Sequence, residues 1–215
     1  MKERPILFSG AMVRALLDRR KTQTRRVVKP QPPVSTEAVQ TFHHPDPRPH
    51  FWANDGASLL DWAQPCPYGD VGDHLYVRET FRPVYPQDPL YNGGEPIEYD
   101  YQATYKTGDR LCDPTRWKPS IHMPRSASRI TLEVADVRVE RLNDISERDA
   151  QAEGVERLNA DLPYWFNYQS STFEYTCLTA RDSFRTLWDS LNAERGYGRD
   201  ANPHVWVVEF KRIEV

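Results

Sequence analysis

Cysteine is scarce in this chain of 215 residues. The three cysteines, Cys66, Cys112 and Cys177, are odd in number and widely spaced. Neither a disulfide framework nor the CxxC pairs of a zinc site can be read from them. The N-terminal residues also have no apolar signal segment behind them. These two absences predict a cytoplasmic protein with reduced thiols.

Long hydrophobic runs are absent as well. No apolar run approaches the roughly 20 residues that a transmembrane helix needs, so we expect no membrane partner. The 6 Trp, 11 Tyr and 8 Phe are too many for a disordered chain. The length suits one domain with a single hydrophobic core.

Several common catalytic motifs are missing. The chain has no phosphate-binding GxxxxGKS/T, no GxGxxG after a strand, no HExxH and no GxSxG. Three histidines, His43, His44 and His50, lie near Asp46 in a proline-rich stretch, but their spacing is not that of metal ligands. This pattern favours a solvated loop, and we expect neither a metal nor a cofactor.

The charge is distributed unevenly. Residues 1–29 hold nine basic and two acidic side chains, a net charge of +7, and the other 186 residues carry −10. The basic side chains cluster at Arg19, Arg20, Lys21, Arg25, Arg26 and Lys29. Such a cluster is either a solvated face or a site that faces an anion or a nucleotide, and charge alone leaves both open.

Proline punctuates the chain, with 18 residues gathered mainly in two stretches. Stretches near 31–60, 84–100 and 157–177 lack clean periodicity, so we expect long loops inserted into a single domain that spans 1–215. Strands are expected at 6–8, 22–28, 74–81, 129–141 and 205–213. Helices are expected at 11–19, from a cap at 146 to 154, and from a cap at 179 to 196.

One strand changes phase. In 129–141 the apolar positions shift between Val134 and Val137, which predicts a bulge or bend such as those at barrel corners. Strands and helices do not alternate regularly, which argues against a doubly wound parallel sheet. The predicted fold class is α+β, a small mixed β-barrel with helices on its rim.

Lys21 breaks a local rule. Arginines flank it on both sides, and like charges lower the pKa of a lysine. A neutral lysine acts as a base near pH 7. Thr24 follows three residues later, close enough to share a site. From the spacing alone, a solvated lysine in a basic turn is the favoured interpretation.

Glu153 breaks another rule. It comes just before Gly154, at the carboxyl end of a predicted helix, where the helix dipole favours cations over carboxylates. The same field raises the pKa of a carboxyl group, which suits acid–base chemistry. An exposed glutamate that tolerates a small cost is the default alternative.

Several motifs together resemble the ASCH family, a branch of the PUA-like β-barrels. The stretch RKTQTRR at 20–26 resembles the signature turn of that family, with the GD turn at 72–73, the helix at 145–154 and the aromatic strand at 205–211 in support. Longer ASCH-like proteins of phages and prophages are similar over PILFSG, CPYG, GDHLYVRETF and WKPSIHMPR. The resemblance covers most of the chain outside the three expected insertions.

The resemblance implies a metal-independent amidohydrolase that removes N4-acyl groups, such as acetyl, from cytidine or cytosine. It places the catalytic residues at Lys21, Thr24 and Glu153. Thr24 is then the nucleophile or positions a water, Lys21 accepts the proton, and Glu153 protonates the leaving nitrogen or orients Lys21. The partner would be a small modified nucleoside or base.

Six further residues are predicted to bind the substrate: Phe8, Arg26, Arg78, Glu79, His122 and Arg125. Arg26 or backbone amides would stabilise the oxyanion. An aromatic ring would stack on the base, with Phe8, Tyr76 and Phe81 as candidates and a core role as the alternative for each.

Two other functions fit the same family resemblance. One is an RNA-binding PUA-like module, which the basic N-terminal segment favours and the acidic remainder opposes. The other is an ASCH-type ribonuclease, for which the sequence offers His122 or His204 without a clear acid–base partner. The oligomeric state is not indicated by the sequence.

Overall fold

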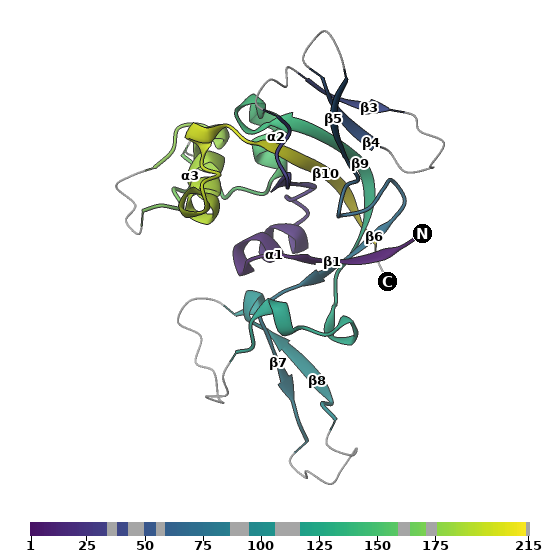
Figure 1. Cartoon of the computed structure of the whole chain (residues 1–215). Helices are drawn as coiled ribbons and strands as arrows, with labels where there is room; N and C mark the ends of the chain where they lie inside the picture. The colour runs from purple at the N-terminus through teal and green to yellow at the C-terminus, as the bar shows by residue number, and fades with distance from the viewer. Residues whose placement is uncertain are drawn as a thin grey trace.

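The computed structural model describes residues 1–33, 38–42, 50–54, 59–86, 95–105, 117–158, 164–170 and 176–213. Three β-sheets and three α-helices lie in this part of the chain (Figure 1). The strands are β1 (Glu3–Leu7), β2 (Gln23–Val27), β3 (Ala38–Phe42), β4 (His50–Asn54), β5 (Leu59–Gln64), β6 (His74–Arg78), β7 (Phe81–Val84), β8 (Glu98–Tyr101), β9 (Thr131–Arg141) and β10 (His204–Ile213). The helices are α1 (Gly10–Leu17), α2 (Glu147–Ala152) and α3 (Ala180–Asn192).

The main sheet has five strands in the order β1-β6-β9-β10-β2. Only β1 and β6 pair in parallel, and the other neighbours are antiparallel. The predicted α+β class with mixed strands is confirmed. The closed barrel is wrong for the described residues, because no ladder joins the edge strands β1 and β2.

One side chain nevertheless connects the two edges of this sheet. Nη2 of Arg26, on β2, donates a hydrogen bond of 2.6 Å to the carbonyl oxygen of Leu7, on β1. The sheet therefore curls far enough for its opposite edges to approach, and α1 links these edges in the sequence (Figure 1). An open seam between β1 and β2 replaces the ladder that would close a barrel.

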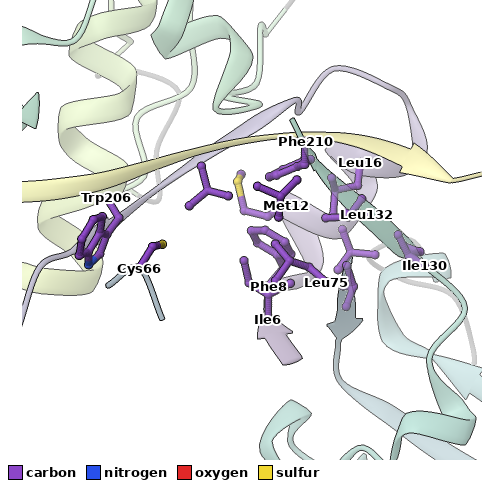
Figure 2. Close-up of a cluster of buried hydrophobic side chains, with 14 of the residues drawn as sticks. Ile6, Phe8, Met12, Leu16, Cys66, Leu75, Ile130, Leu132, Trp206 and Phe210 are labelled. Carbon is purple, nitrogen blue, oxygen red and sulfur yellow. The ribbon is translucent and has the colours of Figure 1, made fainter. Parts of the chain in front are cut away.

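The hydrophobic core fills the hollow of the curled sheet. Met12, Val13 and Leu16 of α1 are buried there, at the helical spacing that places them on one face. Sheet residues complete the core, and Figure 2 shows part of this cluster, including Ile6, Phe8, Leu75, Ile130, Leu132, Trp206 and Phe210. A second buried cluster lies between β10 and the pair α2 and α3.

The predicted irregularity in the 129–141 strand is present. The register between β9 and β10 shifts so that Glu209 faces Asp136 and Phe210 faces Val134, which leaves Ala135 as the extra residue. A bulge of this kind resets which side chains face the core. It explains why the apolar pattern changes phase after Val134.

Two local expectations are wrong. The strand expected at 74–81 ends at Arg78, where Glu79 leaves the strand and forms a buried ion pair with Arg129. The chain continues as β7 from Phe81. The stretch near 31–60, expected as a loop, contains the antiparallel strands β3, β4 and β5. Its prolines lie outside these strands, before β3 and between β3 and β4, where proline costs no ladder hydrogen bond.

Both predicted helix caps are confirmed. The hydroxyls of Ser146 and Thr179 accept hydrogen bonds from the amides three residues later, at the starts of α2 and α3. The carboxylate of Glu147 accepts bonds from the amides of Ala180 and Arg181, so α2 also caps the beginning of α3. None of the helices in the described ranges is long and apolar enough to cross a membrane.

Gly154 ends α2 in a left-handed conformation, with φ +85°. A Cβ atom there would lie 2.8 Å from Cβ of Lys21 and 2.9 Å from Cβ of Ala15. Glycine is thus required twice, for the backbone angle and for the close approach of α2 to the turn after α1. Gly196 has φ +78° with nothing within 4 Å of its virtual Cβ, so only the angle favours glycine there.

Gly154→Ala should therefore destabilise the protein more than Gly196→Ala. We expect a loss of about 1 kcal/mol for Gly196→Ala from the left-handed conformation alone. For Gly154→Ala we expect about 3 kcal/mol, because the methyl group also overpacks two buried neighbours. Urea denaturation of both variants measures the difference, and equal losses would contradict the close contact with Lys21.

Candidate functional site

The carboxyl end of α2 is covered by the turn between α1 and β2. The last carbonyls of a helix lack partners within it and need donors from elsewhere. Four consecutive residues donate to carbonyls at this end, in the order Arg20 to Gly154 O, Lys21 to Glu153 O, the Thr22 amide to Ala152 O, and Gln23 to Asp149 O. Of these carbonyls, Asp149 O also accepts a hydrogen bond from the Glu153 amide. Two of the donors are cations, which the helix dipole favours at this end.

Lys21 is buried within this cap, only 4% exposed. Its Nζ donates to the carbonyl oxygen of Glu153 at 2.7 Å and to Oε2 of the same residue at 3.1 Å. Nζ also lies 5.4 Å from the ring centroid of Phe8. The solvated lysine that spacing alone favoured is therefore wrong.

The pKa of Lys21 is lowered, chiefly because burial disfavours the charged ammonium. The Glu153 carboxylate opposes this shift, and Arg26 and Arg25 add to it. The lowered pKa that the sequence predicts for Lys21 agrees with this arrangement, but the main cause of the shift differs. Burial, rather than crowding by cations, dominates the shift.

Glu153 is buried as well, at 3% exposure, and each of its two carboxylate oxygens binds a different basic side chain. Lys21 binds Oε2 and Nη1 of Arg25 binds Oε1 at 3.2 Å. The alternative of an exposed glutamate is wrong. An arginine stays protonated in proteins, so Arg25 continues to balance the carboxylate when Lys21 loses its proton.

Arg25 was missed by the sequence reasoning, although its side chain is fully buried. It also reaches Glu140 at 2.8 Å and Asp149 at 3.6 Å, and its guanidinium lies 6.0 Å from the ring centroid of Phe184. Strand alternation was the available signal, because it places Arg25 on the same face as Gln23, toward α2. Arg25 thus anchors Glu153 from the helical side of the sheet.

Thr24 and Arg26 alternate with Arg25 along β2 and so belong to its other face. Thr24 is 4% exposed, and no hydrogen bond of its hydroxyl occurs among the described residues. The guanidinium of Arg26 lies 5.2 Å from the ring centroid of Phe8, and its buried Nε has no hydrogen-bond partner in the same part of the chain. The Phe8 ring is therefore contacted by the cations of both Lys21 and Arg26.

Tyr68 is a second residue that the sequence reasoning missed. It packs against the core cluster that contains Phe8, and burial raises the pKa of its phenol while nearby Arg26 opposes the shift. Its position in the CPYG motif was the signal. Tyr68 adds an aromatic ring with a polar tip beside Arg26.

The remaining predicted binding residues lie around β6 and the short turns that follow β8. Arg78 donates to the carbonyl of Ile121, and Glu79 is paired with Arg129 at 2.9 and 3.0 Å. His122 is exposed in its turn. The Phe8 amide donates to the carbonyl of Arg78 at 3.2 Å, the backbone link between this group and Phe8.

Arg125 forms two hydrogen bonds with Glu3, at 2.8 and 2.7 Å, and its guanidinium lies over the ring of Tyr76. Phe81 belongs to a separate small cluster with Met123. In the described ranges, none of the residues Arg78, Glu79, His122 and Arg125 has a hydrogen bond or ion pair with Lys21, Thr24 or Glu153. Their binding role stays a prediction.

His204 does not suit the acid role in a ribonuclease. It is buried at the start of β10, where desolvation and then Arg141 lower the pKa of its imidazole to about 4. The ring is therefore neutral near pH 7 and has no proton to spare as an acid.

No group of three or more His, Cys, Asp or Glu side chains in the described residues is arranged to hold a metal ion. His43, His44 and Asp46 lie outside these residues, and the side chain of His50 is outside them too.

Comparison of the chain with protein-family models, with curated proteins and with solved structures finds no match. The ASCH resemblance therefore depends on the quoted motifs and stays a prediction, as do the functions that it implies.

Replacing Glu153 should cost far more stability than replacing Lys21. Glu153→Gln removes the carboxylate paired with buried Lys21 and one of the three that Arg25 contacts, and breaking a buried pair in this way costs about 3–5 kcal/mol. Lys21→Met keeps the Glu153–Arg25 pair, so we expect about 1 kcal/mol or less. Urea denaturation measures both, with Glu156→Gln, an exposed neighbour, as a control expected within about 0.5 kcal/mol of the parent.

A loss in Lys21→Met as large as that in Glu153→Gln would show that Arg25 does not balance Glu153 on its own.

Proposed function

We propose that the protein is an amidohydrolase that removes N4-acyl groups, acetyl above all, from cytidine or cytosine derivatives. One observation carries this proposal: a buried lysine with a lowered pKa, held by a carboxylate that a second cation neutralises. A lowered pKa increases the unprotonated fraction of a lysine at a given pH, and the unprotonated amine is the form that acts as a general base. The resemblance of the 20–26 stretch to the ASCH signature supplies the substrate class.

In the proposed reaction, the Thr24 hydroxyl attacks the acyl carbonyl carbon and its proton passes to the neutral amine of Lys21. The tetrahedral intermediate then breaks its bond to N4, and the Lys21 ammonium returns the proton to the leaving nitrogen. The products of this half are the cytosine amine and an acyl ester on Thr24. Water hydrolyses the ester, with Lys21 again as the base, and releases a carboxylic acid.

Glu153 is better suited to orienting Lys21 than to donating a proton. Both of its oxygens accept hydrogen bonds from cations, at 3.1 and 3.2 Å, so a proton there would break two charge-assisted contacts. The carboxylate and the Glu153 carbonyl together fix the direction of the Lys21 amine. Of the two roles predicted for Glu153, the contacts support the positioning role.

The oxyanion of the intermediate needs donors that are already oriented. Arg26 is suited to this because one of its nitrogens is held by the Leu7 carbonyl, while its Nε has no partner among the described residues. Phe8 and Tyr68, both near Arg26, are the aromatic candidates for contact with the pyrimidine ring.

The test is the ultraviolet absorbance of N4-acetylcytidine, which changes when the acyl group leaves. Lys21→Met and Thr24→Val should each lower kcat by at least about 100-fold, the scale of a lost base or nucleophile, while the thermal melting curve stays cooperative. Thr24→Ser, which retains a hydroxyl, should keep measurable activity. Lys29→Met, in the same basic segment but exposed, should match the parent.

The pH profile gives an independent readout. The rate should rise with pH as Lys21 loses its proton and reach a plateau below the usual lysine value of 10.5, because burial lowers its pKa. Activity within a few-fold of the parent in Lys21→Met would exclude Lys21 as the base. Unchanged absorbance with the parent protein would exclude the proposed reaction.

A further inference from the structure

A pocket of about 240 Å³ opens where α1 ends beside the last residues of β10. Its lining residues are Leu16, Arg19, Lys21, Thr22, Leu132, Phe210, Lys211 and Arg212. Half of them are basic, and no acidic residue lines the pocket in the described part of the chain. Figure 2 shows three apolar members, Leu16, Leu132 and Phe210, within the core cluster.

Arg19 adopts a backbone conformation that normally selects glycine. Its φ is +59°, in the left-handed region that non-glycine residues rarely occupy. The position directly follows the helix cap Asp18, where chains commonly place glycine to end a helix. Strain of this kind clusters at functional sites, and here the strained residue lines the basic pocket.

Arg212 also departs from the pattern of its strand. In the β9–β10 register it faces Leu132, which is fully buried, whereas Lys211 faces Glu133. Side chains that face each other across an antiparallel pair lie on the same side of the sheet. Arg212 therefore lies on the core side of β10, at the pocket, where the pattern calls for an apolar residue.

The negative end of α1 does not oppose an anion in this pocket. The carbonyls of Arg14, Ala15 and Leu16 already accept hydrogen bonds from the amides of residues 18–21. Asp18, the nearest acidic residue in the sequence, is paired with Arg20 at 3.1 Å. The charged lining residues in the described part of the chain are therefore all basic.

We propose that this pocket binds a phosphate group, with Arg19 and Arg212 as its ligands. The volume exceeds that of a few water molecules, each about 30 Å³, so a phosphate fits with part of its hydration shell. Guanidinium groups match phosphate oxygens in pairs of hydrogen bonds. Lys21 also lines the pocket, although its amine is held by Glu153. The assignment of the ligand as a phosphorylated acylcytidine, whose base reaches the Lys21 site, rests on the proposed function.

Binding can be measured without turnover. Titration calorimetry should show that cytidine 5′-monophosphate binds the parent about tenfold more tightly than cytidine, the effect of one charge-assisted contact. Arg19→Gly and Arg212→Ala should each remove this preference, and Arg19→Lys should keep most of it. Equal affinities in the parent, or a preference that survives in both Arg19→Gly and Arg212→Ala, would overturn the proposal.

Arg19→Gly separates binding from folding. Glycine takes the left-handed conformation without strain, so the melting temperature should rise by about 2 °C while the phosphate preference disappears. Arg212→Ala provides the same loss of preference at a position without backbone strain. A residue with a purely structural role would change the melting temperature and leave the preference intact.

Two comparisons identify the source of the phosphate and separate the two proposals. Affinity that grows with the length of an oligoribonucleotide and falls steeply with salt would assign the pocket to an RNA backbone, and affinity that does not grow would assign it to a mononucleotide. A phosphate preference without deacylation would support the pocket and contradict the proposed reaction. Deacylation without any phosphate preference would do the opposite.

Discussion

The carboxylate of Glu153, shared between Lys21 and Arg25, is the interaction on which the rest of the site depends. An isolated carboxylate at this depth would be neutralised by a proton or exposed to water. Two cations prevent this, but they are not equivalent, since burial lowers the pKa of the lysine whereas an arginine stays protonated in proteins. The arginine holds the charge balance and the lysine is left able to exchange a proton. Without Arg25, Lys21 would have to stay protonated to balance the Glu153 carboxylate, and it would then have only a structural role.

Much of the fold was predictable because its signals are local. The caps at Ser146 and Thr179 and the phase shift after Val134 are short patterns with a direct backbone cause. The open edge between β1 and β2 was not predictable, because closure of a sheet depends on long-range curvature. The strands β3 to β5 were missed because prolines in their connections hid the strand pattern.

The candidate site was predictable in part. Lys21 and Glu153 were singled out because each breaks a local rule, and the structure brings them into contact. Arg25 was overlooked because its sequence neighbours are also basic, so nothing local distinguishes it from them. Its role in the site depends on contacts with residues more than 100 positions away. The residues around β6 were grouped with the site as predicted substrate-binding residues, and sequence gives no measure of the separation between them and Lys21.

Helix α2 has only six residues, far fewer than an isolated helix needs to persist in water. Its carboxyl end is held by hydrogen bonds from residues 20–23, which include Lys21, and its amino end contacts α3 through Glu147. This α-helix, the shortest of the three in the described residues, and the candidate base therefore order each other. Local unfolding of α2 would expose Lys21 to solvent and return its pKa to the ordinary value of a lysine. The same opening equilibrium would therefore affect both the activity and the hydrogen-exchange protection of the α2 amides.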